Sequence, residues 1–172
     1  MTKITKNYII ISGFHDRRKN MIITFFGHSS LQNVVGLAEK IEETILKNIS
    51  PFEKTAFYCG GYGDFDKLCA KVCRSITKTN SNCELIFITP YITSSQQEKI
   101  KDFISLGLYD DVIYPPLEKV PYKFAISRRN EWMVEQSDLI IAYVENSYGG
   151  AYKALEYAYR KKKKIINLVC KN

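Results

Sequence analysis

Apolar and polar positions follow two periods along this chain. Short apolar runs, rich in β-branched and aromatic residues, are typical of strands buried on both faces. The stretches between them repeat apolar residues every three or four positions, as amphipathic helices do. We expect strands at 21–26, 55–59, 84–89, 111–114, 139–144 and 164–168, with a helix after each of the first five, and the first helix should start near residue 31. This alternation predicts right-handed βαβ units and a three-layer Rossmann-like α/β fold with a mostly parallel sheet of about six strands.

The length favours one domain. A chain of 172 residues can bury one substantial core, and residues 21–172 contain the whole alternation. Residues 1–20 form an N-terminal extension that is either disordered or adds an edge strand, and the sequence leaves both alternatives open. Every apolar run is far shorter than a membrane span of about 20 residues, and none resembles a secretory signal. We therefore expect a soluble, cytoplasmic protein with no membrane partner.

Cysteine content and charge change this picture little. The five cysteines are an odd number without a CxxC pair, and the chain has only two histidines. They predict reduced thiols, with no metal site and no other cofactor. The net charge is +7, of which residues 1–20 contribute +4 and leave +3 for the rest. The basic run at 160–164 suits the end of a helix, so a nucleic acid stays open as a partner without being favoured.

Three strand-to-helix turns hold the candidate binding chemistry. Glycine lets the backbone approach a phosphate closely, and the free amides of a helix N-terminus favour an anion. In a parallel sheet such turns share the edge at which ligands bind. The expected contacts are Gly27, His28 and Ser29 after the first strand, Gly60, Gly61, Gly63 and Asp64 after the second, and Tyr148, Gly149, Gly150, Ala151 and Tyr152 after the fifth. Neither GxGxxG after the first strand nor GxxxxGK[ST] is present, so a standard dinucleotide dehydrogenase or P-loop triphosphatase is not expected.

Charged candidates flank the third of these turns. Glu156 lies nearly two turns into the last helix, and its carboxylate would face a ligand held at the start of that helix. Arg128 and Arg129 lie on the preceding helix. Because adjacent helix positions point apart, we expect one of them, Arg129, to reach the same cleft.

The segment around the third turn resembles the SLOG superfamily, which groups the Lonely Guy (LOG) phosphoribohydrolases with DprA-type proteins. The LOG signature has an arginine-lysine pair followed by PGGxGTxxE. Here YGGAYKALE, at 148–156, keeps both glycines and the glutamate, and Arg129 and Met133 match the signature's arginine and the methionine after it. FFGH at 25–28, FYCGGYGDFD at 57–66 and RRNEWM at 128–133 are similar to a bacterial branch of this superfamily. The resemblance covers residues 21–168.

The resemblance implies roles for individual residues. In LOG enzymes the matched arginine and glutamate are catalytic, and the products are a free base and ribose 5′-phosphate. Arg129 and Glu156 would therefore be catalytic in a LOG-like phosphoribohydrolase. Tyr152 and Lys153 replace the glycine and threonine that help to bind phosphate, and Asn130 replaces the lysine, so turnover stays open. LOG-like proteins commonly dimerise through helices near the site, which implies a homodimer.

Three functions follow from these patterns. The first is binding of a nucleotide or nucleotide-derived small molecule at the glycine-rich turns, as in a sensor. The second is hydrolysis or transfer at an N-glycosidic bond by Glu156 and Arg129, because residues 137–142 together with Glu156 are also similar to nucleoside 2-deoxyribosyltransferases. The third is a DprA-like module that associates with single-stranded DNA through its basic ends.

Overall fold

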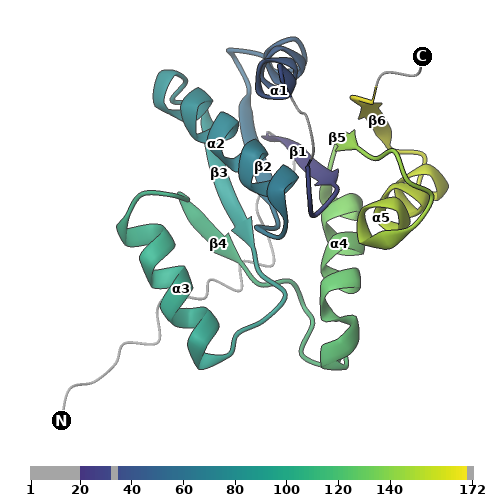
Figure 1. Cartoon of the computed structure of the whole chain (residues 1–172). Helices are drawn as coiled ribbons and strands as arrows, with labels where there is room; N and C mark the ends of the chain where they lie inside the picture. Colours follow the sequence, from purple (N-terminus) through teal and green to yellow (C-terminus); the bar gives the residue numbers. More distant parts are fainter. Residues whose placement is uncertain (1–19, 32–34, 170–172) are drawn as a thin grey trace.

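The computed structural model describes residues 20–31 and 35–169, and within these ranges a six-stranded sheet is flanked by five α-helices (Figure 1). The strands are β1 (Asn20–Gly27), β2 (Lys54–Cys59), β3 (Cys83–Ile88), β4 (Asp111–Ile113), β5 (Leu139–Tyr143) and β6 (Lys164–Asn167). The helices are α1 (Leu37–Leu46), α2 (Asp64–Thr79), α3 (Ser94–Ser105), α4 (Ala125–Gln136), which a 3₁₀ turn at Tyr122–Phe124 precedes, and α5 (Gly149–Arg160). The predicted three-layer Rossmann-like class is confirmed.

All the strand pairs are parallel, in the order β4-β3-β2-β1-β5-β6. The chain moves outward from β1 to β4, crosses back to place β5 against the other side of β1, and ends at β6. Ile23 of β1 is therefore in register with Phe57 on one side and Leu139 on the other. The direction of progression reverses at β1, and ligands of open α/β sheets bind beyond the strand ends at such a point.

Two cores cover the two faces of the sheet. Helices α1, α2 and α3 pack on one face, and α4 and α5 pack on the other (Figure 1). Successive side chains of a strand point to opposite faces, so Ile23 and Phe25 enter the first core while Ile22 and Phe26 enter the second. Burial on both faces is the reason that the strands are continuous apolar runs in the sequence.

The first helix differs from its prediction. It begins at Leu37, not near residue 31, and Gly36 before it has a left-handed backbone with φ of 76°. Apolar spacing at 31–35 suggested a helix, but the glycine lets the chain turn into the helix only at this later position. The alternatives for the N-terminal extension lie outside the described residues, apart from Asn20, which begins β1.

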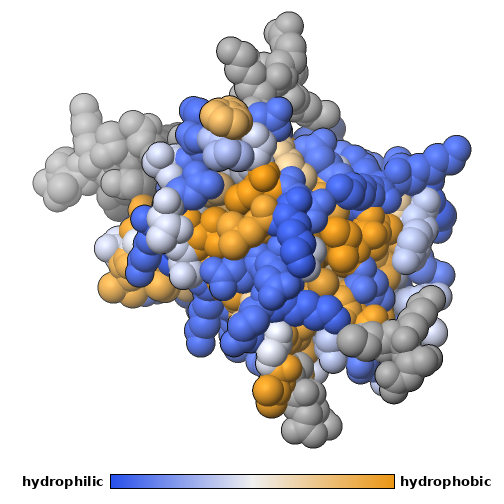
Figure 2. All heavy atoms as spheres, turned by 90° about the horizontal axis from the view of Figure 1, so that it is seen from above, coloured by the Kyte–Doolittle hydropathy of each residue, from blue (hydrophilic) through white to orange (hydrophobic). Residues whose placement is uncertain are grey.

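The described residues contain no membrane-spanning helix, and their surface carries both polar and apolar areas. No helix within residues 20–31 and 35–169 is both long and apolar enough to cross a bilayer. On the face shown in Figure 2, apolar areas are separated by a band of hydrophilic side chains. Four of the cysteines, Cys59, Cys69, Cys73 and Cys83, are buried free thiols, and Cys170 lies outside the described residues.

Candidate ligand site

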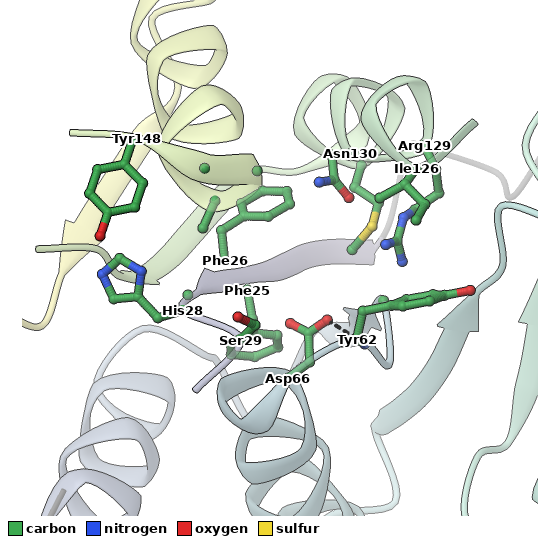
Figure 3. A pocket seen from close by; sticks show the side chains of 16 residues that line it. Phe25, Phe26, His28, Ser29, Tyr62, Asp66, Ile126, Arg129, Asn130 and Tyr148 are labelled. Atoms are coloured by element: carbon green, nitrogen blue, oxygen red, sulfur yellow. Dashed lines mark hydrogen bonds between the residues drawn. The ribbon is translucent and has the colours of Figure 1, made fainter. Parts of the chain in front are cut away.

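A cavity of about 260 Å³ opens beyond the carboxyl end of β1, at the switch point of the sheet (Figure 3). Its wall comes from the end of β1, from the turns that follow β1, β2 and β5, from helices α2 and α4, and from the start of α5. Of the residues predicted from the sequence, nine line it: Gly27, His28, Ser29, Gly60, Arg129, Tyr148, Gly149, Gly150 and Ala151. Six do not: Gly61, Gly63, Asp64, Arg128, Tyr152 and Glu156. The structure therefore brings parts of all three glycine-rich turns to one hollow.

Arg129 brings a buried positive charge to this cavity. Its side chain comes from α4, and the residue is only 2% exposed. Nη1 donates a 2.9 Å hydrogen bond to the carbonyl of Ile88, whereas the buried Nε has no partner. The guanidinium carbon lies 5.3 Å from the centre of the Tyr62 ring. Burial lowers the pKa of Arg129, and the nearby Asp66 carboxylate opposes that shift.

Gly60 makes room for this arginine. A Cβ atom at Gly60 would lie 2.1 Å from Nη1 of Arg129, well inside contact distance. Residue 60, directly after β2, therefore has to be a glycine if the Arg129 guanidinium is to keep its position. This glycine accommodates a side chain of the protein itself and is not by its own geometry a phosphate contact.

Asp66 is the acid at the cavity, and the sequence analysis did not select it as a ligand contact. It is 9% exposed, and its Oδ2 accepts a 2.9 Å hydrogen bond from the backbone N–H of Tyr62. Loss of solvent raises the pKa of Asp66 to about 6, against the opposing effects of Arg129 and of the Tyr62 amide. The signal that could have found it is its helical spacing, since Asp66, Cys69 and Cys73 share the buried face of α2.

His28 connects two of the turns. Its Nε2 accepts a 2.9 Å hydrogen bond from the backbone N–H of Glu145 and a longer one of 3.5 Å from that of Asn146. Nε2 therefore carries no proton here, and the proton of the neutral ring is on Nδ1. The side chain lines the cavity while it holds the turn after β5 against the end of β1.

The remaining residues of the second turn are structural neighbours of the cavity. Gly63 has φ of 90°, and a Cβ there would lie 2.7 Å from the Cα of Ser29. The N–H of Asp64 donates to the carbonyl of Ser29 at 2.9 Å. Gly61 has φ of 72° and packs on the ring of Phe87. The contacts of Gly63 and Asp64 with Ser29 hold the first and second turns together, and Gly61 packs the second turn against β3.

The two other charged candidates lie on solvent faces. Arg128 is exposed and pairs with Glu131 at 2.6 Å, so the structure places Arg129 and not Arg128 at the cavity. Glu156 is exposed and accepts a 2.8 Å hydrogen bond from the hydroxyl of Tyr152. The buried side of α5 carries Ala154 and Leu155, and the helical period turns Glu156 away from it. The expected projection of this carboxylate into the cleft is therefore absent from the structure, and its catalytic role stays a prediction.

Sequence reasoning also passed over several uncharged residues of the wall. Phe26, Ile126 and Met133 form an apolar side, and Tyr62 and Asn130 add polar groups. Phe26 and Met133 had the spacing of core residues, and nothing in the local pattern separates a core position from the wall of a cavity. Their place in the site depends on how α4 packs across the end of β1.

Comparison with known proteins supports the fold. No family model matches the sequence, and no curated protein matches it. Among solved structures, the chain is similar to DNA processing protein A (DprA) from Helicobacter pylori, a protein that binds single-stranded DNA. The TM-score is 0.62 at 14% identity, and the match covers 90% of this chain and 68% of that one. At this identity the likeness concerns the fold alone, so the chain has a DprA-like Rossmann arrangement.

Proposed function

We propose that this protein binds a nucleotide or nucleotide-derived ligand in the cavity at the end of β1. The observation that carries the proposal is the buried Arg129, which lines a hollow walled by glycine-rich turns and whose Nη2 has no acceptor among the described residues. A buried cation with an unused donor is costly, and a ligand that offers an acceptor removes that cost. Such a group at the switch point of an open parallel sheet supports ligand binding.

The composition of the wall suits an amphipathic molecule of mononucleotide size. Arg129, Asp66 and Ser29 supply polar groups, and Phe26 and Met133 supply an apolar surface. The volume of about 260 Å³ is just below the range of roughly 300–1,000 Å³ that small-molecule sites occupy. One mononucleotide therefore fits the proposal better than a dinucleotide.

The start of α5 offers open backbone amides. Gly149 and Gly150 are the first residues of this helix, and a Cβ atom at either would meet nothing within 4 Å. Backbone amides at a helix N-terminus attract anions, and Gly149 and Gly150 line the same cavity as Arg129. A phosphate can approach this backbone without displacing a side chain.

Two arginines on one helix provide a matched test. We would measure binding of nucleosides and nucleoside monophosphates by calorimetry and thermal unfolding for the wild type, Arg129→Met and Arg128→Met. Arg129→Met keeps the buried volume but removes the charge, so affinity should fall at least about tenfold. Arg128→Met changes an exposed ion pair and should leave affinity within about twofold. No binding by the wild type, or equal losses in both variants, would contradict the proposal.

Association with single-stranded DNA is the second candidate, supported by the DprA-like fold and the net charge of +7. The basic run at 160–164 gives it little support, because Lys163 donates to the carbonyls of Glu135 and Ser137 at 2.8 and 2.9 Å. Lys161 pairs with Glu135 at 3.4 Å. These lysines stabilise the end of α4.

A single-stranded oligonucleotide titrated at several salt concentrations tests this candidate. Strong weakening with salt is expected of phosphate contacts. If a mononucleotide displaces the oligonucleotide and Arg129→Met weakens both, the strand uses the cavity. An oligonucleotide that binds with unchanged affinity to Arg129→Met uses another surface, and one that never binds removes the candidate.

A further inference from the structure

Two opposite charges face the cavity without pairing. Arg129 enters from α4 and Asp66 from α2, and Figure 3 shows the guanidinium and the carboxylate directed toward each other from opposite walls. Both residues are buried, at 2% and 9% exposure. Among the described residues, every carboxylate oxygen is more than 4.0 Å from the nitrogens of Arg129, so this arginine forms no ion pair with them.

Each group keeps hydrogen-bonding capacity. Nη1 of Arg129 donates to the Ile88 carbonyl, and no described residue accepts a hydrogen bond from Nη2. Oδ2 of Asp66 accepts from the Tyr62 amide, and no other described residue donates to this carboxylate. A carboxylate accepts several hydrogen bonds, so Asp66 keeps an acceptor on one wall of the cavity and Arg129 keeps a donor on the other.

A phosphate fits this space poorly. It would gain from Arg129, but it would also stand beside the Asp66 carboxylate where little water screens the repulsion. A neutral group that accepts from the guanidinium and donates to the carboxylate satisfies both charges. Two parts of a nucleotide have this chemistry: a ribose hydroxyl, and a base edge with adjacent acceptor and donor atoms.

We infer that Asp66 is a specificity-determining residue, which together with Arg129 binds a neutral donor–acceptor group of the ligand and directs its phosphate to the amides of Gly149 and Gly150. This inference rests on the proposed function. Asp66 is the only acid among the described residues of the wall, and it belongs to α2, so the part of the wall that α5 forms carries no carboxylate of its own. The ligand therefore has one orientation in the cavity.

A two-by-two measurement tests this orientation. We would compare the dissociation constants of a nucleoside and of its 5′-monophosphate for the wild type and Asp66→Asn. Asparagine has one acceptor oxygen for two donors, the Tyr62 amide and the ligand. Both compounds should therefore lose roughly tenfold in affinity, by the same factor. If the phosphate instead lies beside Asp66, removing the negative charge tightens the monophosphate relative to the nucleoside, and the inference is overturned.

Asp64 provides the matched control. Asp64 lies two residues before Asp66 on α2 and outside the cavity wall. Its carboxylate pairs with Lys67 at 3.8 Å. Asp64→Asn should change neither dissociation constant by more than about twofold. An effect of Asp66→Asn that does not exceed that of Asp64→Asn also overturns the inference. Should Asp66→Asn fail to fold, Asp66→Ser offers one acceptor in less volume for the same cycle.

Two further compounds distinguish the sources of the neutral group. Ribose 5-phosphate has the hydroxyls without the base, and the free base has the edge without the hydroxyls. The compound whose affinity depends on Asp66 identifies the group. If none of the four compounds binds the wild type, the proposed function fails and the inference with it. If they bind and only the Asp66 dependence is missing, the inference alone fails.

Discussion

The turns after β2 and after β5 each contain a glycine pair, yet the two pairs are packed in opposite ways. A Cβ at Gly60 or Gly61 would meet Arg129 at 2.1 Å or the ring of Phe87 at 2.5 Å. A Cβ at Gly149 or Gly150 would meet nothing within 4 Å. The first pair makes space that the protein's own side chains fill, and the second leaves space open to the cavity.

This difference separates two uses of glycine that look the same in a sequence. At the turn after β2, Gly60 leaves the space that the Arg129 side chain from α4 occupies, and Asp66 of α2 lines the same cavity. The turn after β5 is an open backbone at the start of α5. A ligand in the cavity would meet the Arg129 and Asp66 side chains beside the turn after β2, and backbone amides at the start of α5. Substitutions in the two turns should therefore have different effects.

The largest effect is expected from Gly60→Ala. The added methyl group overlaps the buried guanidinium, which has to leave its hydrogen bond to the Ile88 carbonyl. Overpacking of this kind, with a buried charge displaced, should lower the free energy of unfolding by roughly 3 kcal/mol. Urea denaturation measures it. A loss below about 1 kcal/mol would show that Arg129 moves aside easily and that the wall is not rigid.

Asp66→Asn should change how stability depends on pH. The pKa of Asp66 is about 6 in the folded protein, raised by burial from its ordinary value of 3.8. Between these values the folded state holds more protons than the unfolded state, so this residue's contribution to stability falls as pH rises from about 4 to about 6. The fall is at most about 3 kcal/mol. Unfolding at pH 4 and at pH 7 should show the asparagine variant gaining stability relative to the wild type, whereas a constant difference would contradict the shift.

Gly150→Ala should separate stability from binding. Alanine is the better helix former and meets no atom within 4 Å, so the free energy of unfolding should rise by about 0.5 kcal/mol. The same methyl group projects where a phosphate would approach the amides, so nucleoside monophosphates should bind more weakly while nucleosides are less affected. Thermal unfolding and calorimetry on one preparation test both. An unchanged ratio of the two affinities would place the phosphate elsewhere.

Glu156→Gln should have the smallest effect. The carboxylate is exposed, and its contact is with Tyr152 on the same helix, so stability should change by less than about 0.5 kcal/mol. Ligand affinity should stay within about twofold of the wild type. A tenfold loss in affinity would show that the side chain reaches the ligand after all. Release of free base from a nucleoside monophosphate that Glu156→Gln abolishes would support the catalytic role predicted from the sequence.

The sequence alone determined the order and type of the elements. Hydrophobic periodicity is a local property, because burial of a strand on two faces, or of a helix on one, leaves its pattern in neighbouring residues. The six strands, their parallel alternation with helices and the gathering of glycine-rich turns at one edge could therefore be predicted. The start of α1 could not be predicted, because the helical spacing of apolar residues already begins before Gly36, where the chain turns into the helix.

Tertiary structure decided which side chains make the cavity. Nη1 of Arg129 bonds a carbonyl 41 residues away, and His28 bonds an amide 117 residues away. The order of the strands and the crossover from β4 to β5 bring residues this far apart in the sequence into contact. Neither feature leaves a local pattern in the sequence. For the same reason Asp66 was not among the predicted contacts, whereas Glu156 looked like a ligand contact. The motif at 148–156 gave the spacing between the glycine pair and Glu156. The direction in which each carboxylate points depends instead on how its helix packs on the sheet.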